Sequence, residues 1–336
     1  MMILVDAMGG DNAPLEIVRG CIDGVREFNM DKIVLIGKEA ELEKILSDEG
    51  ADMSKFEIMH ADDVIYADDP PVDAVMKKKD SSMVKGLEYI RKNPSDVFIS
   101  AGNTGALMAG SLLKIGRIKG VGRPALAPTI PTLKEEMLLI DAGANADCKP
   151  ENLVQFAVIG SIYMDKVRGK SNPKVGLLNI GVEENKGNEL TKAAFKKLKE
   201  SKEINFVGNI EARDILYGEV DVLVCDGFVG NVILKLIEGM AQAMFIMLKK
   251  ELNKNSLTKL GAGLAKPAFK NIKKTMDYTE YGGAPLLGIN GGVIKMHGSS
   301  NRHAVKNAIG QAILFAKHGV VDRTVELISE LEGDLK

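Results

Sequence analysis

The amino-acid sequence predicts an α/β protein with a mostly parallel, open sheet and helices on both of its faces. Short runs rich in Val, Ile and Leu recur along the chain, and each run ends in Gly or a small polar residue. The apolar residues of these runs are nearly continuous, which is typical of strands buried on both faces. Segments with three- and four-residue apolar spacing separate the runs, and this alternation favours parallel strands joined by helices.

The predicted elements follow this alternation, and we expect the whole chain, 1–336, to form one α/β unit whose two lobes flank a cleft. The predicted strands are Ile3–Ala7, Lys32–Gly37, Phe56–Ala61, Asp96–Ala101, Met137–Ala142, Lys174–Gly181, Ile204–Gly208, Asp221–Cys225 and Val293–Met296. The predicted helices are Leu15–Phe28, Ser82–Arg91, Ala106–Ile115, Glu151–Val167, Asn188–Lys199, Gly230–Leu248 and Ala304–Lys317.

Charge and cysteine content exclude some classes of protein. The 44 Lys and Arg residues nearly balance the 46 Asp and Glu residues, whereas a general nucleic-acid-binding protein carries a basic excess. The three cysteines match no Cys-x-x-Cys spacing, so we expect them to be reduced in a cytoplasmic protein. The N-terminus shows no secretion signal, and no window approaches the ~20 apolar residues of a spanning helix, so we do not expect an integral membrane protein.

Polar, glycine-rich turns follow most of the predicted strands. In open parallel sheets ligands bind outside the carboxyl ends of the strands, so we expect these turns to line one cleft with N–H, amide and hydroxyl groups. Ordinary turns and helix caps use the same residue types, and this alternative explains several of the glycines. The turns are DAMGGDNAP, SAGNTGA, DAGANADCKP, NIGVEENKGNE, GNIEARD, CDGFVGN and MHGSS.

The turn SAGNTGA (100–106) is the sharpest local signal. It joins a predicted strand to a predicted helix, so its N–H groups and the helix dipole would favour an anion. Asn103, Thr104 and Gly105 are therefore predicted to bind phosphate, although Asn103 or Thr104 would also serve as a plain helix cap. The sequence contains no nucleotide-binding P-loop, and no strand leads into a dinucleotide-binding Gly-x-Gly-x-x-Gly.

The other turns supply further candidates for the same cleft. His297, in HGSSNRH, would transfer a proton or only donate a fixed hydrogen bond, and a structural role is the commoner one for such a residue. The remaining candidates each have a plain capping explanation as well. They are Asp6, Gly9, Gly10, Asn145, Lys186, Asn188, Asp226, Gly227, Asn231, Lys235, Ser299 and Ser300.

Motifs for covalent and metal chemistry are missing from the sequence. It has no Gly-x-Ser-x-Gly elbow, no His-Glu-x-x-His and no Cys beside a suitable His, and its carboxylates have no metal-ligand spacing. We therefore expect no metal ion and no other cofactor. The predicted site binds and orients anions and supplies no covalent nucleophile.

Long motifs, spread in order from Asp6 to Ser300, resemble the PlsX family of phosphate acyltransferases. The resemblance implies a homodimer with a fold similar to phosphotransacetylases and the isocitrate dehydrogenase-like group. It also implies that acyl-[acyl carrier protein] and phosphate give acyl phosphate and free carrier, and that a membrane glycerol-3-phosphate acyltransferase uses the product. The motifs are VDAMGGDNAP, SAGNTGALMAG, GRIKGVGRPALAP, DAGANADCKPENLVQFA, VGLLNIGVEENKGNELTK, GNIEARD, VCDGFVGNVILKLIEG and YGGAPLLGINGGVIKMHGSS.

This reaction agrees with the predicted anion site, because bound phosphate would itself attack the thioester. Most of the rate acceleration would come from orienting the phosphate and from preset hydrogen-bond donors to the developing oxyanion. The resemblance gives no firm catalytic set, so our assignment rests on the turns. Asp226, Asn231, Lys235 and His297 are predicted to be catalytic, with Lys235 or His297 near the carbonyl or the leaving sulfur.

Two other functions stay open. An NAD-dependent dehydrogenase of the isocitrate dehydrogenase-like group would need an acidic residue for the ribose and usually a metal-binding Asp cluster, and neither is clear here. A non-enzymatic scaffold for lipid-synthesis enzymes would not need several polar strand-exit turns.

The segment Lys249–Thr275 breaks the alternation of strands and helices. It holds eight Lys and one Glu, so its net charge is +7 (8 − 1) in a chain whose formal net charge is −2. We expect 249–276 to be a protruding basic amphipathic tip, divided at Pro267 into two short helices. The predicted membrane-contact residues of its apolar stripe are Leu257, Leu260, Leu264 and Phe269.

Three interpretations of this tip stay open. It would pack on its own protein or on a dimer mate, contact anionic lipid, or bind acyl carrier protein, which as a family is acidic. Contact with lipid would deliver acyl phosphate close to the membrane enzyme that uses it. We expect a cytoplasmic protein with peripheral membrane association.

Overall fold

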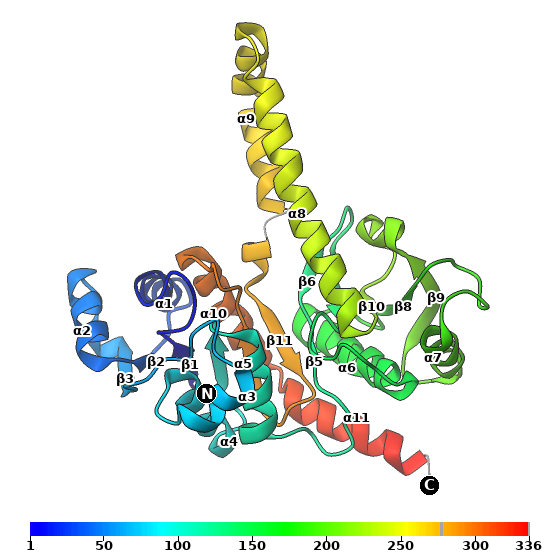
Figure 1. Ribbon diagram of the computed structural model, residues 1–336, viewed down its shortest axis with the longest axis horizontal. Helices are drawn as coiled ribbons and strands as arrows, with labels where there is room; N and C mark the ends of the chain where they lie inside the picture. The colour runs from blue at the N-terminus through cyan, green and yellow to red at the C-terminus, as the bar shows by residue number, and fades with distance from the viewer. Residues whose placement is uncertain (276–277, 335–336) are drawn as a thin grey trace.

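The computed structural model describes residues 1–275 and 278–334, and these form two lobes, each built on its own sheet (Figure 1). The first sheet has seven strands in the order β3-β2-β1-β4-β12-β11-β5, and the second has five in the order β6-β7-β10-β8-β9 among the described residues. Neighbouring strands are parallel, except where β11 pairs with β12 and β5 and where β6 pairs with β7. The fold class predicted from the sequence is thus confirmed.

The strands of the first sheet are β1 (Ile3–Asp6), β2 (Ile33–Gly37), β3 (Phe56–His60), β4 (Val97–Ser100), β5 (Ala125–Leu126), β11 (Ala284–Leu287) and β12 (Gly292–Lys295). Those of the second are β6 (Thr129–Pro131), β7 (Glu136–Ile140), β8 (Lys174–Asn179), β9 (Asn205–Glu211) and β10 (Val222–Val224). Each strand predicted from an apolar run is present. The sequence predicts one sheet, however, and the division into two depends on the short strands β5 and β6, through which the chain passes from one lobe to the other.

The helices are α1 (Leu15–Glu27), α2 (Glu39–Asp48), α3 (Pro71–Lys77), α4 (Ser82–Lys92), α5 (Thr104–Gly110), α6 (Pro150–Arg168), α7 (Glu189–Glu200), α8 (Gly227–Leu252), α9 (Ser256–Thr275), α10 (Arg302–Lys317) and α11 (Val320–Asp334). Short 3₁₀ helices lie at η1 (Met53–Lys55), η3 (Ala212–Tyr217) and η4 (Tyr278–Tyr281), and a π-helical turn lies at η2 (Ser111–Ile115). The predicted helices are present, but the predicted helix Ala106–Ile115 divides into α5 and the π-helical turn η2.

Helices cover both faces of the first sheet. Ile3 and Val5 of β1 belong to the same cluster of buried side chains as Val18 of α1, whereas Leu4 belongs to the cluster that holds Val84 of α4. Successive side chains of a strand point to opposite faces, so this division shows that α1 and α4 lie on opposite sides of β1. Burial on both faces explains why the strand reads as a continuous apolar run.

The second sheet is also covered on both faces. Leu138 of β7 shares a buried cluster with Phe156 of α6, and Leu139 lies in another cluster with Ile233 of α8. The cluster that contains Phe156 extends to helix α1 of the first lobe, so the two lobes share one core. The start of α8 is therefore held against the second sheet, and this contact fixes the direction in which the rest of the helix leaves the molecule.

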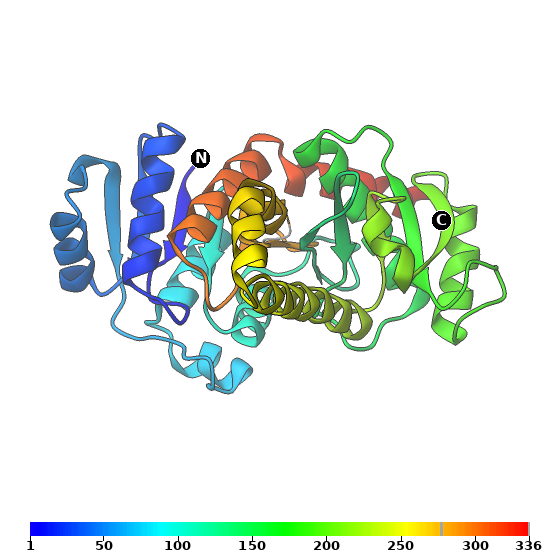
Figure 2. The ribbon, with the colours of Figure 1, turned by 90° about the horizontal axis from the view of Figure 1, so that it is seen from above.

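Helices α8 and α9 form a long hairpin that rises above the junction between the lobes (Figures 1 and 2). The prediction that Pro267 divides the tip is wrong, because α9 continues through it. Pro267 is exposed, so the helical carbonyl that loses its donor there faces water. The chain instead turns between α8 and α9, near Asn253, and the protruding part includes most of α8, not only the segment from Lys249.

Helix α8 also corrects the expectation about membrane-spanning segments. It is long and apolar enough, by length and composition alone, to cross a membrane, and its apolar stretch is not buried within the described residues. Lys235, Glu238 and two glycines interrupt its apolar residues, so the sequence shows no unbroken apolar run there. Its outward side chains include Leu236, Met240, Met244 and Met247, all exposed.

Candidate functional site

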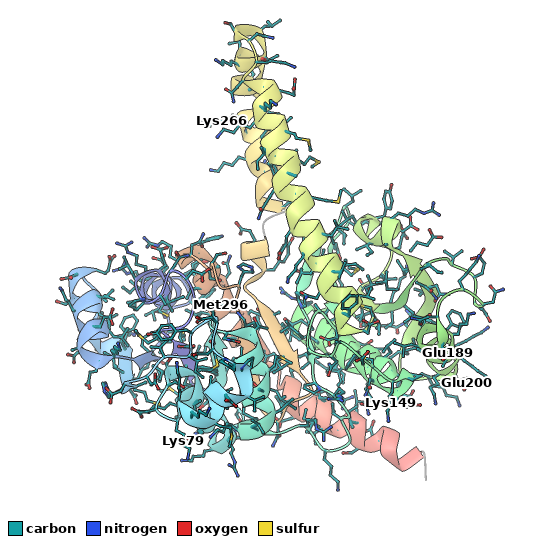
Figure 3. The ribbon with its side chains drawn as sticks, viewed as in Figure 1. Lys79, Lys149, Glu189, Glu200, Lys266 and Met296 are labelled. Atoms are coloured by element: carbon teal, nitrogen blue, oxygen red, sulfur yellow. The ribbon has the colours of Figure 1, made fainter. Side chains whose placement is uncertain are left out.

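A cavity of about 420 Å³ lies between the lobes, and we call it the inter-lobe cavity. The first lobe contributes Thr104 at the start of α5 and the segment 295–298 after β12. The second lobe contributes Gly143, from the turn after β7, and Asn231 and Lys235 from α8. Met296 lies near the centre of the molecule, beneath the base of the hairpin (Figure 3). Carboxyl ends of parallel strands from both sheets thus meet at one site.

A second cavity, of about 670 Å³, adjoins the first, and we call it the loop cavity. It is lined by Gly10 and Asp11 after β1, by 101–105 after β4 and by Tyr66. Thr104, Lys295 and Gly298 line both cavities, so the two are neighbours.

The buried side chain of Asp6 holds together the turns that line the loop cavity. Its buried carboxylate accepts hydrogen bonds from the hydroxyl of Ser82 at 2.6 Å and from that of Ser100 at 2.7 Å. Burial raises the pKa of Asp6, and these bonds oppose the rise. A Cβ at Gly9 would lie 2.4 Å from the Asp6 carboxylate and 2.8 Å from the Gly102 nitrogen. The predicted residues Asp6 and Gly9 therefore shape the turns after β1 and β4, and Gly10 reaches the cavity wall.

Lys295 is the functional candidate that the sequence analysis missed. It ends β12, is only 8% exposed, and places its ammonium 3.4 Å from the carbonyl oxygen of Ala101 and beside that of Met296. Burial lowers its pKa to about 8, and the carboxylates of Asp6 and Asp11 oppose this fall. The sequence does contain a sign of this role, because Lys295 is the one charged residue in the apolar run Val293–Met296 and lies near its carboxyl end.

The phosphate-binding turn predicted after β4 is built as a helix cap. The Asn103 side chain accepts a hydrogen bond from Ala106 N at 3.0 Å and donates to the carbonyl oxygens of Tyr66, Ala67 and Asp69. Both ends of this amide are thus occupied by backbone groups. Thr104 lines both cavities, and Asn103 and Gly105 line the loop cavity.

His297 is held by its own turn. Its Nδ1 lies 2.8 Å from the hydroxyl of Ser299, and the hydroxyl of Ser300 donates to the His297 carbonyl oxygen at 2.7 Å. The contact with Ser299 orients the imidazole, the Ser300 hydroxyl holds the backbone of the turn, and His297 lines the inter-lobe cavity.

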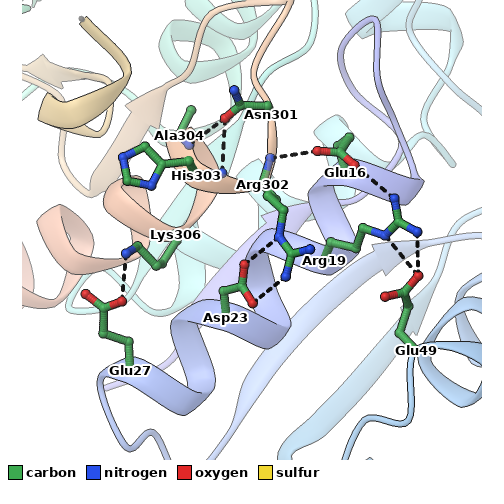
Figure 4. A network of polar contacts seen from close by, with 10 residues as sticks. All are labelled: Glu16, Arg19, Asp23, Glu27, Glu49, Asn301, Arg302, His303, Ala304 and Lys306. Atoms are coloured by element: carbon green, nitrogen blue, oxygen red, sulfur yellow. Dashed lines mark hydrogen bonds and ion pairs between the residues drawn. The ribbon is translucent and has the colours of Figure 1, made fainter. Parts of the chain in front are cut away.

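A polar network fixes the helix that follows this turn (Figure 4). Arg302, the first residue of α10, donates two hydrogen bonds of 2.7 Å to Asp23 of α1, and its backbone N–H donates to Glu16 at 3.0 Å. These contacts lower the pKa values of Asp23 and Glu16. Each exposed ion pair contributes only about 0.2–1 kcal/mol to the free energy of unfolding. The main effect of the network is therefore to position α10 against α1, and with it the turn 297–301.

Asp141 has the same organising role in the second lobe as Asp6 has in the first. Its fully buried carboxylate accepts from the backbone N–H groups of Leu126, Ala144 and Asn145 at 2.7–3.0 Å, and from the Asn145 amide at 2.9 Å. That amide also donates to the carbonyl oxygen of Pro124 at 2.7 Å. Asn145, predicted to bind substrate, thus braces a buried turn and does not line the two cavities described above.

Helix α8 docks on the Asp141 turn through two glycines. A Cβ at Gly227 would lie 2.5 Å from the Asp141 carboxylate, and a Cβ at Gly230 would lie 1.9 Å from the Asp141 carbonyl oxygen. Asp226 caps the helix by accepting from Val229 N at 2.9 Å. Asn231 directly follows Gly230, whose close approach to Asp141 fixes this part of α8, and Asn231 therefore lies in the wall of the inter-lobe cavity.

Lys186 and Asn188 are not brought to these cavities. They lie exposed in the turn between β8 and α7, where Asn188 caps α7 by accepting from Thr191 N at 2.9 Å. The neighbouring residue Glu189 lies on the outer side of the second lobe, away from Met296 (Figure 3). The turns after β8 and β9 therefore do not join the cleft that the sequence analysis expected all seven turns to form.

The amino-acid sequence matches one family model and several relatives over nearly its whole length. A family model described as "Fatty acid synthesis protein" matches residues 1–323. The chain is 54% identical over 333 residues to "Phosphate acyltransferase" of Thermoanaerobacterium thermosaccharolyticum, covering 98% of both chains, and 51% identical over 334 residues to the protein of that name from Alkaliphilus oremlandii, covering 99% of both.

Solved structures support the fold. A phosphotransacetylase from Streptococcus pyogenes matches with a TM-score of 0.61 and 17% identity, and the EutD phosphotransacetylase from Staphylococcus aureus with 0.58 and 15%, each match covering 94% of both chains. At this identity the likeness shows the fold alone. The family matches favour an acyltransferase over the dehydrogenase alternative.

Proposed function

The chain belongs to the family of phosphate acyltransferases, enzymes that transfer an acyl group to phosphate, and on this premise we propose its substrate, site and mechanism. The acyl donor is the thioester of acyl carrier protein, and the product is acyl phosphate for phospholipid synthesis. Reaction takes place in the inter-lobe cavity. The observation that carries this proposal is the buried ammonium of Lys295 at the junction of the two cavities, beside Thr104 and the turns after β1, β4 and β7.

Phosphate binds between Lys295 and Thr104, at the junction of the two cavities. A buried cation attracts a dianion far more strongly than a solvated one, because little water screens it. Held there, phosphate faces Asn231, Lys235 and His297 across the inter-lobe cavity. The thioester carbonyl lies among these donors, which stabilise the developing oxyanion or the leaving thiolate.

Phosphate attacks the thioester directly, without an acyl-enzyme. Burial raises the pKa of the Cys148 thiol to about 11 and that of the Cys225 thiol well above its ordinary value. Both thiols stay protonated near neutral pH and are poor nucleophiles. One oxygen of phosphate forms the new bond to the acyl carbon, the bond from that carbon to sulfur breaks, and the carrier thiol leaves.

The reaction itself is tested by mixing the protein with acyl-carrier thioester and phosphate and trapping acyl phosphate as its hydroxamate. We expect hydroxamate above the background that hydroxylamine forms from the thioester, and only with both protein and phosphate. A yield that does not depend on phosphate contradicts the proposed function.

Replacing Thr104 by Val should lower kcat/KM for phosphate by about 10²-fold, the loss typical of one preset donor. The change removes a hydroxyl from the wall shared by both cavities and keeps the shape of the side chain. Thr104→Ser keeps the hydroxyl and is the matched control. Phosphate kinetics of Thr104→Val equal to those of the unaltered protein would remove Thr104 from the phosphate site.

The remaining partners are part of the same proposal. The enzyme acts in the cytoplasm as a homodimer and passes acyl phosphate to a membrane glycerol-3-phosphate acyltransferase. The α8–α9 hairpin supports peripheral contact with anionic membrane, because Leu257, Leu260 and Leu264 are 79%, 65% and 80% exposed among the lysines of α9. Near an anionic surface each such Lys contributes about 1 kcal/mol. Phe269 is half-buried and is the weakest of the predicted lipid contacts.

Leu260→Glu should abolish flotation of the protein with anionic liposomes and leave turnover in solution unchanged. The change puts a carboxylate in the apolar stripe that would enter the interface. Met53→Glu, at an exposed position of the first lobe, is the control and should float as the unaltered protein does. Retained flotation of Leu260→Glu contradicts the membrane contact, and a raised KM for the carrier would favour carrier docking instead.

A further inference from the structure

An apolar groove of about 350 Å³ lies at the base of the α8–α9 hairpin. Thr132, Asn271 and Thr275 contribute to its lining, but most of the lining is apolar: Ile130 of β6, Leu216 of η3, Leu234 and Ile237 of α8, and Ile272 of α9. These side chains are hydrocarbon, and the groove has the size of a small-ligand site. Nothing in the proposed reaction so far uses it.

The groove is continuous with the inter-lobe cavity. Thr129, Leu234 and Glu238 line both of them. Along α8, Asn231 and Lys235 line the inter-lobe cavity alone, Leu234 and Glu238 line both, and Ile237 lines the groove alone. At 1.5 Å per residue, the six residues from Asn231 to Ile237 span about 9 Å. One helix thus borders both the cavity that holds Asn231 and Lys235 and the apolar groove.

We propose that this groove binds the hydrocarbon chain of the acyl group, with the thioester carbonyl held at the polar end in the inter-lobe cavity. The inference rests on the proposed function, because it takes the acyl thioester as the substrate of that cavity. It adds a site that selects substrates by chain length.

The order of the lining residues favours a linear acyl chain over other occupants. Such a chain is polar at one end and apolar along the rest, and the joined compartments offer Asn231 and Lys235 at one end and Ile237 and Ile272 at the other. The carboxylate of Glu238 stands at the boundary, where the charges of His297 and Lys235 oppose the rise in its pKa that burial causes. A charged or branched polar ligand would leave its polar groups unpaired beside Ile237 and Ile272.

Ile237→Trp and Ile272→Trp test the groove from its two helical walls. Each indole would fill the groove, while Leu236→Trp, on an outward side chain of α8 that is 57% exposed, adds the same indole elsewhere. We compare KM and kcat for carrier thioesters of increasing chain length. Burial of each methylene is worth about fourfold in affinity, so losing only two of them costs more than tenfold.

Both groove variants should raise KM for long-chain thioesters by at least tenfold and leave short-chain turnover nearly unchanged, and Leu236→Trp should keep the unaltered profile. Ile272 is 48% exposed, so its variant should fold even if Ile237→Trp does not. Unchanged long-chain KM in a folded groove variant overturns the proposal. A changed oligomeric state with an unchanged chain-length profile would also overturn it, because the groove would then hold a second copy of the chain.

Direct binding separates this inference from the proposed function. A fluorescent long-chain fatty acid should bind the unaltered protein and the Leu236→Trp variant, and at least tenfold more weakly to Ile272→Trp. If the unaltered protein forms no acyl phosphate from any thioester, the proposed function fails, but this binding result still decides whether the groove takes an acyl chain. Equal binding to all three proteins contradicts the groove.

Discussion

Lys295→Met should lower kcat by about 10²–10³-fold, because it removes the buried cation that we propose holds phosphate for attack. The Met side chain fills much of the same space, and Asp6 keeps its hydrogen bonds from Ser82 and Ser100. The thermal unfolding midpoint should therefore change little, and this measurement separates a role in the reaction from a role in folding. Unchanged kcat, or a loss of activity that follows a loss of folded protein, contradicts the assignment.

The same residue predicts a pH dependence with a defined sign. Burial lowers the pKa of Lys295 to about 8, so the ammonium carries its charge below about pH 8 and loses it above. KM for phosphate should thus rise once the pH exceeds about 8, by up to tenfold per pH unit. Lys295→Arg stays charged in this range and should remove the dependence. Phosphate KM measured on both sides of that pH checks this, and a flat profile in the unaltered protein counts against it.

Gly230→Ala should destabilise the protein by about 3 kcal/mol or more, the upper range for adding atoms to a packed interior. The new Cβ would lie 1.9 Å from the Asp141 carbonyl oxygen and 2.9 Å from the sulfur of Cys225. The carbonyl belongs to the backbone of a buried turn and has no room to move. Helix α8 would have to shift, and it would carry Asn231 and Lys235 out of the inter-lobe cavity, so activity should fall together with stability.

Gly239→Ala is the matched control on the same helix. A Cβ at Gly239 has no described atom within 4 Å, so the substitution should stabilise the protein by about 0.5–1 kcal/mol through helix propensity alone. Urea unfolding of both variants measures the difference. Equal stabilities for Gly230→Ala and Gly239→Ala would contradict the described docking of α8.

Much of the fold could be predicted because buried parallel strands leave a continuous apolar run. Runs such as Ile3–Ala7 and Lys174–Gly181 end within two residues of the strands in the structure. Strand β5 has only two residues and is too short to show a repeating pattern of apolar residues in the sequence. It is nevertheless the last strand that the chain adds to the first sheet before β6 begins the second. The continuity of α9 through Pro267 depends on solvent exposure, which local sequence does not show.

The position of the two cavities could be predicted from the sequence, but not the roles of the residues around them. Turns after β1, β4, β7, β10 and β12 do line or support the two cavities, as expected from the carboxyl ends of parallel strands. Capping and ligand binding use the same residue types, so sequence alone could not tell that the amides of Asn103 and Asn145 are occupied by backbone groups. Lys295 could not be singled out from its place in the sequence alone, because a Lys at the end of a strand is usually solvent-exposed, whereas this one is buried between the two cavities. The catalytic assignments to Asp226, Asn231, Lys235 and His297 stay predictions.

Isotope exchange tests the central claim, which is direct attack of bound phosphate on the thioester. Labelled free acyl carrier protein is mixed with the enzyme and unlabelled acyl-carrier thioester, with and without phosphate, and label entering the thioester is followed. Direct attack predicts exchange only when phosphate is present, because acyl phosphate is then the one intermediate from which the thioester can re-form. Equal exchange without phosphate would require an acyl group held covalently on the protein and would contradict the account.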